Sequence, residues 1–427
     1  MSEFLKFTPG EYYDFEREAV QERLDMAAGK KPMDGMGMPG PGPGGPMEPQ
    51  PYSDEEVLAY NKKWDPYNPL FNDPDYAKKA GYSGVPAYPG FVGRGGMAVS
   101  PFSKDISSGG FYYTNDGTDI YLSRPVCSGD LLKDGPSKGE FKEVTIPGSE
   151  LRQWFMGGSG SMVDEEGNVV VYAEGNTRDC YKQFADPDRP AKNFSDNMAE
   201  WCEYFPPAHY TTDADWDRIR AIWAAEEIRG AEPRYWEDVE VGTFMTETCS
   251  GPVTYMDMIS LYGNMMRLTR EQLSNPDYLK TMFRDPYGNY LFETSIHLGT
   301  RNLPNGRMVF YNDTAARLLA RTVTNWIGDA GYVSRFAWRF FPFFKEMQNV
   351  YMPKDYDLIT RVVPGYENRP LNRHGSEGDT VIGKAYIYNK SIDENGRHLI
   401  DICAWGETLD GDIIQVCPMQ ACLPSKG

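Results

Sequence analysis

The clearest periodic pattern in the chain lies in residues 313–327, DTAARLLARTVTNWI. Its apolar side chains recur at helical spacing and would form one broad stripe along a helix. Asn312 precedes the segment as a helix-capping residue, and Gly328 follows it as a typical C-terminal stop. The pattern therefore predicts a helix over 313–327 with one face buried against other elements.

Shorter helical patterns occur elsewhere in the chain. The segment 53–56, Ser-Asp-Glu-Glu, has the form of a capping box and predicts a helix that runs to about residue 63. Amphipathic spacing predicts helices over 11–28 and 213–227, and weaker helical patterns cover 254–262 and 270–282.

Alternating apolar and polar positions indicate strands in two blocks. In residues 334–344, SRFAWRFFPFF, every second side chain is aromatic over the first half of the run. Similar runs cover 111–114, 118–124, 142–155 and 168–181 in one block, and 380–390, 398–406 and 412–422 in the other. Acidic residues followed by Gly or Asn-Gly separate several of these runs, which is typical of antiparallel hairpins.

The two blocks repeat one another. Residues 124–130, RPVCSGD, match 373–379, RHGSEGD, in the spacing of Arg, Gly and Asp, and a helix precedes each block. One helix followed by an antiparallel meander, twice, predicts an α+β chain in which each sheet wraps around its helix.

The repeat also suggests a division of the chain. We predict an N-terminal helix and a Gly/Pro/Met-rich linker over 1–51, a first domain over 52–187, a connection over 188–232 and a second domain over 233–427. Such Gly and Pro density in 30–51 cannot pack a core, so it is expected to be a spacer.

Composition narrows the class of partner. The chain has 427 residues and a net charge of −19, which argues against nucleic acid or an anionic membrane as a partner. No apolar run is long enough to cross a membrane, and the first residues lack the pattern of a secretory signal. The seven cysteines are scattered without metal-binding spacing, so we expect reduced thiols, no metal site and a cytoplasmic location.

Several segments resemble those of the MaoC-type (R-specific) enoyl-CoA hydratases and acyl dehydratases, and in particular their two-domain members. They are 68–77 (NPLFNDPDYA), 234–242 (RYWEDVEVG), 324–331 (TNWIGDAG), 405–407 (WGE), 410–411 (DG) and 423–425 (LPS). The resemblance covers most of 52–427. It implies two tandem hot-dog domains and reversible addition of water to a 2-enoyl thioester.

The family motif needs an Asp and a His about five residues apart, which together activate a water as general base and acid. In the first block, Phe71 stands at the histidine position and the nearest acid, Asp65, is displaced by one residue. This half is therefore expected to be catalytically silent. In the second block, Glu293 and His297 are the candidate pair, and His297 lies 15 residues before Asn312.

The resemblance also implies an oxyanion contact at the start of the central helix, where a free N–H and the helix dipole favour developing negative charge. Here that position holds Tyr311 and Asn312, which we predict to contact the substrate, although capping is the simpler role for Asn312. For Glu293 and His297 the structural alternatives are a solvated acid and a satisfied loop histidine. If the loop folds differently, Asp285 is the substitute acid.

Other polar residues have simpler interpretations. Of the four histidines, His209 is expected to be structural, and His374 and His398 to be exposed. The basic residues Arg335, Arg339 and Lys345 could contact coenzyme A phosphates, but surface charges on a strand are the preferred interpretation. The glycine runs 93–96 and 157–160 lack the pattern of a phosphate-binding loop and are expected to allow close packing or a bulge.

Three functional hypotheses remain. The first is a hydro-lyase acting on an enoyl-CoA or 3-hydroxyacyl-CoA. The aromatic residues around the presumed tunnel favour a bulky or aromatic acyl group as much as they favour a plain aromatic core; they are Phe283, Tyr287, Phe310, Tyr311, Phe336 and Trp338. The second is a non-catalytic acyl-CoA-binding or partner subunit, and the third is a dehydratase with a non-thioester substrate. No separate cofactor is expected, because coenzyme A would be part of the substrate. Family habit and sheet edges suggest a homodimer or a heteromer with a related subunit.

Overall fold

The structure is a computed structural model of the full chain. It describes residues 3–28, 30, 49–91, 108–190, 209–254, 257, 274, 276, 283–284, 290–291, 310, 314–339, 358, 361–363, 373 and 375–427.

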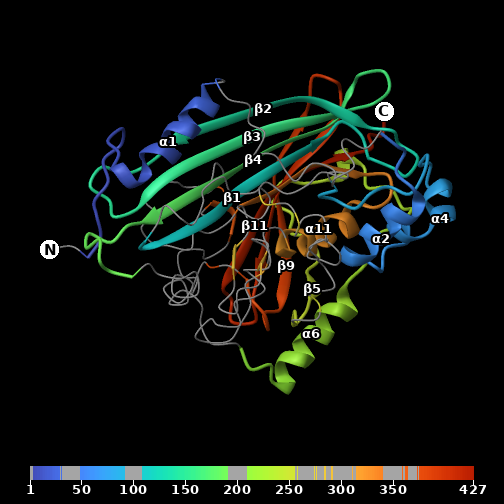
Figure 1. Ribbon diagram of the computed structural model, residues 1–427. Helices are drawn as coiled ribbons and strands as arrows, with labels where there is room; N and C mark the ends of the chain where they lie inside the picture. Colours follow the sequence, from blue (N-terminus) through green and yellow to red (C-terminus); the bar gives the residue numbers. More distant parts are fainter. Residues whose placement is uncertain are drawn as a thin grey trace.

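The described strands form one large antiparallel sheet of nine strands in the order β2-β3-β4-β1-β8-β11-β10-β9-β5 (Figure 1). Their bounds are β1 (Gly110–Leu122), β2 (Lys133–Glu143), β3 (Arg152–Val163), β4 (Val169–Lys182), β5 (Thr248–Ser250), β8 (Tyr332–Arg339), β9 (Val381–Ile392), β10 (His398–Glu407) and β11 (Ile413–Leu423). A separate pair joins β6 (Phe283–Arg284) to β7 (Tyr290–Leu291).

The described helices are mostly short. They are α1 (Asp14–Ala27), α2 (Asp54–Trp64), α3 (Pro69–Asn72), α4 (Pro74–Lys79), α6 (Asp213–Ala225), the 3-10 turn η3 (Trp236–Asp238) and α11 (Thr314–Ile327). The predicted helices over 11–28, 53–63, 213–227 and 313–327 correspond to α1, α2, α6 and α11 and are confirmed. Those over 254–262 and 270–282 lie almost entirely outside the described residues.

The sheet of the second block wraps around α11, which contacts β5 and β8 to β11. Leu319 and Val323 on the inner face of α11 are fully buried, and burial of one such side chain contributes about 1.5–3 kcal/mol. A Cβ atom at Gly383 would lie 2.5 Å from Thr322 Oγ1, so the helix packs directly on the backbone of β9. The predicted α+β class, with a sheet wrapped around a central helix in the hot-dog manner, is confirmed.

The two blocks join inside the sheet, where β1 pairs with β8. Ile120 lies opposite Phe336 in this register. On the other face of the sheet, Asp119 accepts hydrogen bonds from Arg335 at 2.5 Å and is 2.7 Å from Arg339. Arg339 is 5% exposed and the side chain of Arg335 is 16% exposed, so the interpretation of these two arginines as surface charges is wrong. Both guanidinium groups can be buried because they share the carboxylate of Asp119.

The predicted repeat is confirmed in its hydrogen bonds. Arg124 contacts Asp130 at 2.7 Å, and Arg373 contacts Asp379 at 2.7 Å. Each aspartate also accepts the N–H three residues before it, at 2.8 Å and 2.7 Å respectively. The same local turn therefore closes the loop before the meander in both blocks. The domain boundaries stay predictions.

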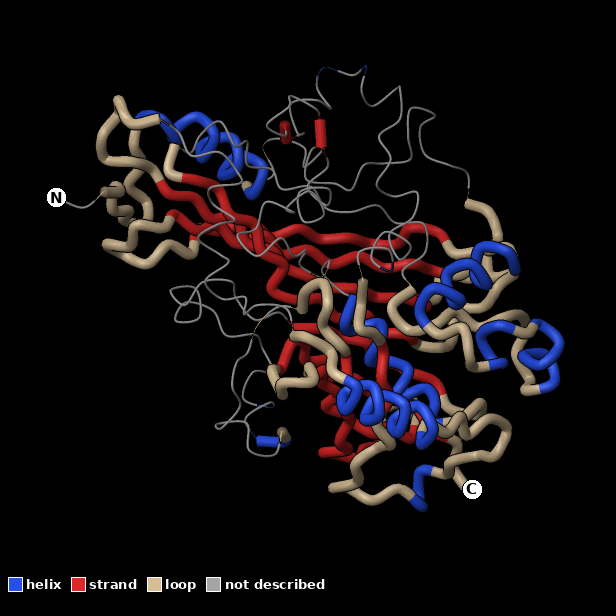
Figure 2. The backbone as a smooth tube through the Cα atoms, turned by 90° about the horizontal axis from the view of Figure 1, so that it is seen from below, coloured by secondary structure: helices blue, strands red, loops and turns tan. Residues whose placement is uncertain are grey.

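The N-terminal segment covers the far ends of the strands of the first block. In Figures 1 and 2, α1 lies at the end of these strands opposite α2 and α4. Phe7 and Val20 pack there against Trp154 and Tyr181, and Arg152 bonds Glu16 at 2.5 Å with both side chains fully buried. Residues 3–28 therefore belong to the folded body of the protein.

The strand predictions differ from the structure in two places. The run 142–155 is not one strand, because β2 ends at Glu143 and β3 begins at Arg152, with a turn between them. The runs 111–114 and 118–124 form one strand with a register shift between Asn115 and Gly117. The glycine run 157–160, expected to allow close packing or a bulge, lies inside β3 and pairs in regular register with β2 and β4.

Candidate functional site

The motif segment folds into short helices whose starts are set by side chains. Asn68 accepts the N–H of Leu70 at 3.0 Å, and Asp73 accepts the first two free N–H groups of α4. Both residues are N-caps, and each is followed by proline, which fits the first helical position because it has no N–H to satisfy. Local folding thus explains the Asn-Pro and Asp-Pro steps of the motif.

Residues 52–91, which we call the overhang, extend from the first block and lie against α11 of the second block (Figure 1). The phenol of Tyr88 donates to the carbonyl of Arg317 at 2.8 Å. The phenol of Tyr76 donates to Asp329 Oδ2, just beyond the helix, at 2.7 Å. The segment that carries the motif of the first block therefore covers the central helix of the second.

Phe71 is the residue that the family resemblance sets at the position of the motif histidine. Its side chain is 6% exposed and belongs to the apolar core that includes α11. Its ring meets that of Tyr88 edge-on, with the centroids 5.4 Å apart. Because a phenyl ring exchanges no proton, the described site has no base at this position.

Asp65, the nearest acid, is fully buried. Its Oδ1 accepts the N–H of Tyr67 at 3.2 Å, whereas Oδ2 has no hydrogen-bond partner among the described residues. Burial raises the pKa of the Asp65 carboxyl, and the positive charge of Arg321 opposes that shift. The carboxyl therefore lies where water has no ready access.

Arg321 of α11, whose charge acts on Asp65, is paired with another carboxylate, that of Glu226. Its terminal nitrogen donates to Glu226 Oε1 at 3.0 Å and to the carbonyl of Cys249 at 2.7 Å. Burial raises the pKa of Glu226 as well, again against the charge of Arg321. Arg321 and Glu226 form an ion pair, and their charges act on Asp65 without a hydrogen bond to it. These three residues, which we call the buried ionic cluster, come from α11, the connection and the overhang.

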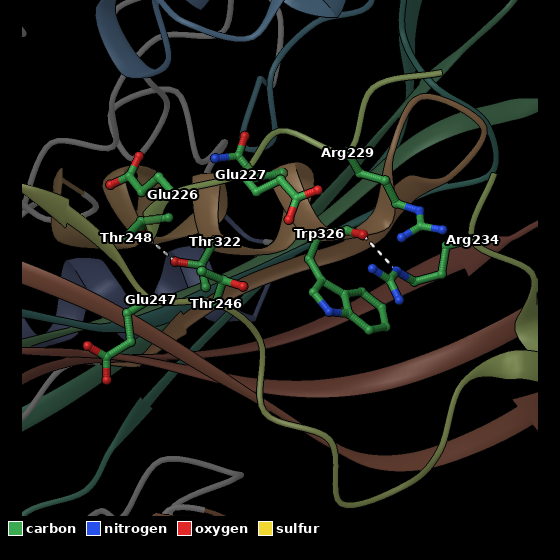
Figure 3. A pocket seen from close by; sticks show the side chains of 10 residues that line it. Glu226, Glu227, Arg229, Arg234, Thr246, Glu247, Thr248, Thr322 and Trp326 are labelled. Atoms are coloured by element: carbon green, nitrogen blue, oxygen red, sulfur yellow. Dashed lines mark hydrogen bonds between the residues drawn. The ribbon is translucent and has the colours of Figure 1, made fainter. Parts of the chain in front are cut away.

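Glu226 also lines a pocket of about 90 Å³ at the C-terminal end of α11 (Figure 3). Its walls come from the connection, the segment that leads into β5, and α11. The lining residues are Glu226, Glu227, Arg229, Arg234, Thr246, Glu247, Thr248, Thr322, Asn325 and Trp326. This volume suits a small polar molecule and is far below the roughly 300–1,000 Å³ of sites for larger ligands.

The predicted site residues lie outside the described part of the chain. These are the catalytic candidates Glu293 and His297 and the substrate-binding candidates Tyr311 and Asn312. The described part of α11 begins at Thr314. The roles of the four residues stay predictions. Asp285, Lys345 and His374 also lie outside the described residues.

The two described histidines have structural contacts. His209 lies between two carboxylates, with Nδ1 2.9 Å from Asp410 and Nε2 3.0 Å from Asp215. This agrees with the structural role expected of His209. His398 is half-buried, and its ring packs against Trp236 at 5.1 Å, so the expectation of an exposed side chain is wrong.

The buried ionic cluster was not anticipated from the sequence. A signal was nevertheless present, because Arg317 and Arg321 stand four residues apart within the apolar pattern of α11. Two cations at that spacing share one helix face, and a buried cation requires a partner. The carboxylate that pairs with Arg321 is that of Glu226, which lies in a segment distant in the sequence.

Neither a metal site nor a membrane span is found in the described ranges. No group of three or more His, Cys, Asp and Glu side chains within them is placed to hold a metal ion. No helix within them is both long and apolar enough to cross a membrane.

Comparisons with known proteins give matches among solved structures alone. No protein-family model matches the chain, and no curated protein matches it. Among solved structures, the chain is similar over most of its length to MaoC-like dehydratases. A protein described as "MaoC-like dehydratase" has 17% identity and a TM-score of 0.48, with 88% of this chain and 96% of that chain covered.

Two further structures are similar to the chain. A putative MaoC domain protein dehydratase from Chloroflexus aurantiacus has 12% identity and a TM-score of 0.44, covering 89% of this chain and 94% of its own. A conserved hypothetical protein from Mycobacterium tuberculosis, described as having a double hot-dog fold, has 12% identity and a TM-score of 0.41, covering 88% and 93%. The likeness concerns the fold.

Proposed function

We propose that the protein is a hydro-lyase that adds water to a 2-enoyl-CoA or removes it from a 3-hydroxyacyl-CoA. The observation that carries the proposal is the overhang. Its motif segment folds into capped helices that lie against a central helix, as the family resemblance implies, but Phe71 and the buried Asp65 leave it without proton transfer. The reaction is therefore assigned to the second block.

In the proposed mechanism, Glu293 and His297 hold and activate the water. His297 removes a proton as the oxygen attacks the enoyl carbon, and the pair returns a proton to the neighbouring carbon. A backbone N–H near Tyr311 and Asn312 stabilises the thioester oxygen as it gains negative charge, and the N-terminal dipole of α11 adds to this effect.

The proposal includes a bulky or aromatic acyl group and a cytoplasmic location. Among the aromatic residues considered for the tunnel, Phe310, Phe336 and Trp338 are buried in the core that includes α11. This supports the core interpretation for these three rings. The argument for a bulky acyl group consequently rests on the remaining aromatic residues, and turnover of arylated enoyl-CoAs tests it directly.

A second candidate is a non-catalytic acyl-CoA-binding subunit that acts beside a related chain. It is favoured by the state of the first site, where Phe71 is packed into the core and Asp65 is enclosed. The two candidates differ in whether the purified chain turns over substrate alone.

The test is loss of the enoyl-thioester absorbance when the full chain meets short, long and arylated enoyl-CoAs. Turnover by the native chain, with a loss of about 10²-fold or more in His297→Ala and Glu293→Gln, is the expected result. His209→Ala is the matched control, because it removes a histidine that contacts Asp215 and Asp410 and is assigned no part in the reaction. Thioester binding without turnover would replace the lyase by the partner subunit, and no binding would overturn both.

A further inference from the structure

The extended start of the N-terminal segment is bound in the way that a sheet binds an added peptide strand. We call residues 3–28 the arm. Its first residues exchange four main-chain hydrogen bonds, of 2.8–3.0 Å, with 148–149 and 183–185 of the first block. Main-chain bonds of this kind do not depend on the identity of the side chains, so any specificity has to come from side-chain contacts.

Two aromatic rings, three positions apart in the arm, supply such contacts. Phe4 stacks on Phe184 with the ring centroids 5.2 Å apart. Phe7 is fully buried and meets Tyr181 edge-on at 5.8 Å. The guanidinium of Arg152 lies over the Phe7 ring at 4.6 Å. Buried rings held in this way are typical anchors of a bound segment.

A buried arginine of β3 is directed at the arm. Arg152 is fully buried, and its Nε and Nη2 donate to the two carboxylate oxygens of Glu16 in α1, at 3.0 and 2.5 Å. Nη2 also donates to the carbonyl of Glu11 at 2.8 Å, and Nη1 to that of Thr8 at 3.0 Å. Every nitrogen of the guanidinium therefore contacts the arm. A two-fold contact of this kind selects a carboxylate by its geometry as well as by its charge.

The arm and the strands beneath it form a core of their own. Phe7 and Val20 of the arm pack there against rings of β2, β3 and β4. Within the described part of the chain, this core shares no residue with the large core around α11. The sequence that follows the arm, 31–48, is mostly Gly, Pro and Met, which is typical of a spacer. The arm can therefore leave its site without opening the rest of the fold.

We propose that the arm is a tethered ligand of the first block, and that its site also binds the arm of a second copy of the chain. The site consists of 141–154 and 181–185, which we call the arm site. Its ligand is an extended segment with two aromatic rings three positions apart, followed by a helix that carries a carboxylate. The arm of another copy has all of these groups, and an exchange of arms re-forms the same contacts. This interaction goes beyond the proposed hydro-lyase and does not depend on it.

The chain's own arm is expected to hold the arm site in a dilute solution. A spacer between a ligand and its site gives the ligand an effective concentration on the order of 1 mM. A second copy at micromolar concentration cannot compete with that concentration. Exchange consequently requires an arm site that its own arm has left vacant, and the test creates such a site.

The test mixes two full-length variants, each defective in one half of the contact. In the arm variant, Phe7→Ala and Glu16→Gln weaken the arm and leave the arm site intact. In the site variant, Arg152→Gln weakens the arm site and leaves the arm intact. The site variant is labelled isotopically, so that its peptides are distinguished by mass. Hydrogen exchange within 14–27 of the labelled chain then reports whether its arm is bound.

Alone, the site variant is expected to exchange rapidly within 14–27 and slowly within α11, because only the arm is released. The arm variant should slow the exchange within 14–27 about tenfold when its concentration is tenfold the dissociation constant. The native chain should have no effect at the same concentration, because its arm site holds its own arm. Lys142→Gln is the charge-matched control for Arg152→Gln. It alters an exposed pair with Glu140 and should leave 14–27 protected without any partner.

Slower exchange with the arm variant, and unchanged exchange with the native chain, supports the proposal. No slowing at any soluble concentration of the arm variant overturns it, because the arm site then serves its own arm alone. Equal slowing by the native chain also overturns it, since the contact would lie elsewhere. If Arg152→Gln speeds exchange within α11, Phe184→Ala takes its place, because it removes one ring of the arm site and keeps the buried cation. None of these outcomes depends on hydro-lyase activity.

Discussion

The guanidinium of Arg373 donates hydrogen bonds to both carboxylate oxygens of Asp379, at 2.7 and 3.0 Å, with both side chains buried. It also donates to Asp412 at 2.8 Å. At the same place in the repeat, Arg124 bonds Asp130 at 2.7 Å, but the Arg124 side chain is 41% exposed. One turn thus occurs in a buried and a half-exposed form within a single chain.

Removal of the arginine is expected to affect the two copies unequally. Arg373→Gln leaves two buried carboxylates without their cation and should lower the free energy of unfolding by about 3–5 kcal/mol. Arg124→Gln breaks a partly solvated pair and should cost about 1 kcal/mol or less. Urea unfolding of both variants gives the comparison. Equal losses would contradict the assignment of the energetic difference to burial.

The attachment of α1 is expected to depend on Glu16. This carboxylate is fully buried against Arg152, which also bonds Glu143. Glu16→Gln removes a buried charge partner and should weaken the packing of α1 by about 3 kcal/mol. Faster hydrogen exchange and proteolysis within 14–27, with unchanged exchange in α6, is the expected result. Asp14→Asn, which alters an exposed pair with Arg17, is the control and should leave both unchanged.

The carboxyl of Asp65 is expected to destabilise the fold when it is ionised. Burial raises its pKa in the folded state, against the opposing charge of Arg321. A group with a raised folded-state pKa contributes stability at low pH and loses that contribution as the pH rises through the folded value. Asp65→Asn should therefore be more stable than the native chain at pH 7, and the difference should disappear near pH 3.

Urea unfolding between pH 3 and pH 8 measures this difference. Enoyl-CoA turnover by Asp65→Asn should equal that of the native chain, because the first site is assigned no proton transfer. A loss of turnover at unchanged stability would show that Asp65 takes part in the reaction.

The contribution of His209 to the stability of the fold is expected to decrease as the pH rises. Burial acts to lower its pKa, but the hydrogen bonds and charges of Asp215 and Asp410 outweigh burial and raise the pKa above its usual value. The stabilisation is therefore present at acid pH and is lost as the pH rises through the folded value. His209→Ala should cost up to about 1 kcal/mol at pH 5.5 and almost nothing at pH 9.

Thermal unfolding of native and variant chains across this range is the measurement. His398→Gln is a suitable reference, because His398 packs on a ring and has no described ion pair. A cost of His209→Ala that grows with pH would reverse the predicted sign.

Sequence periodicity was sufficient to predict those helices and strands that bury one continuous face. The apolar stripe of 313–327 predicts α11, and the strands β9, β10 and β11 follow from alternation between acid-Gly turns. The repeat of Arg and Asp was visible because all of its partners lie within six residues. Such signals are local, so a single sequence contains them.

The buried ionic cluster could not be found in this way. Arg321 and Glu226 are 95 positions apart, and Asp65 lies still farther away, so their meeting depends on how the overhang crosses α11. The turn between Glu143 and Arg152 is a different case, because Pro147-Gly148 is a typical turn dipeptide and this local signal was overlooked. The pairing of β1 with β8 likewise joins strands that are far apart in the sequence, so no local pattern predicts it.

The overhang has a consequence for how such a chain can evolve. Phe71 and Tyr88, which belong to the overhang, close the core around a helix that belongs to the other block. Deleting the overhang would strip apolar surface from that helix, so loss of one block would damage the other. The two blocks are therefore interdependent, and any change of residues in the overhang has to preserve its shape.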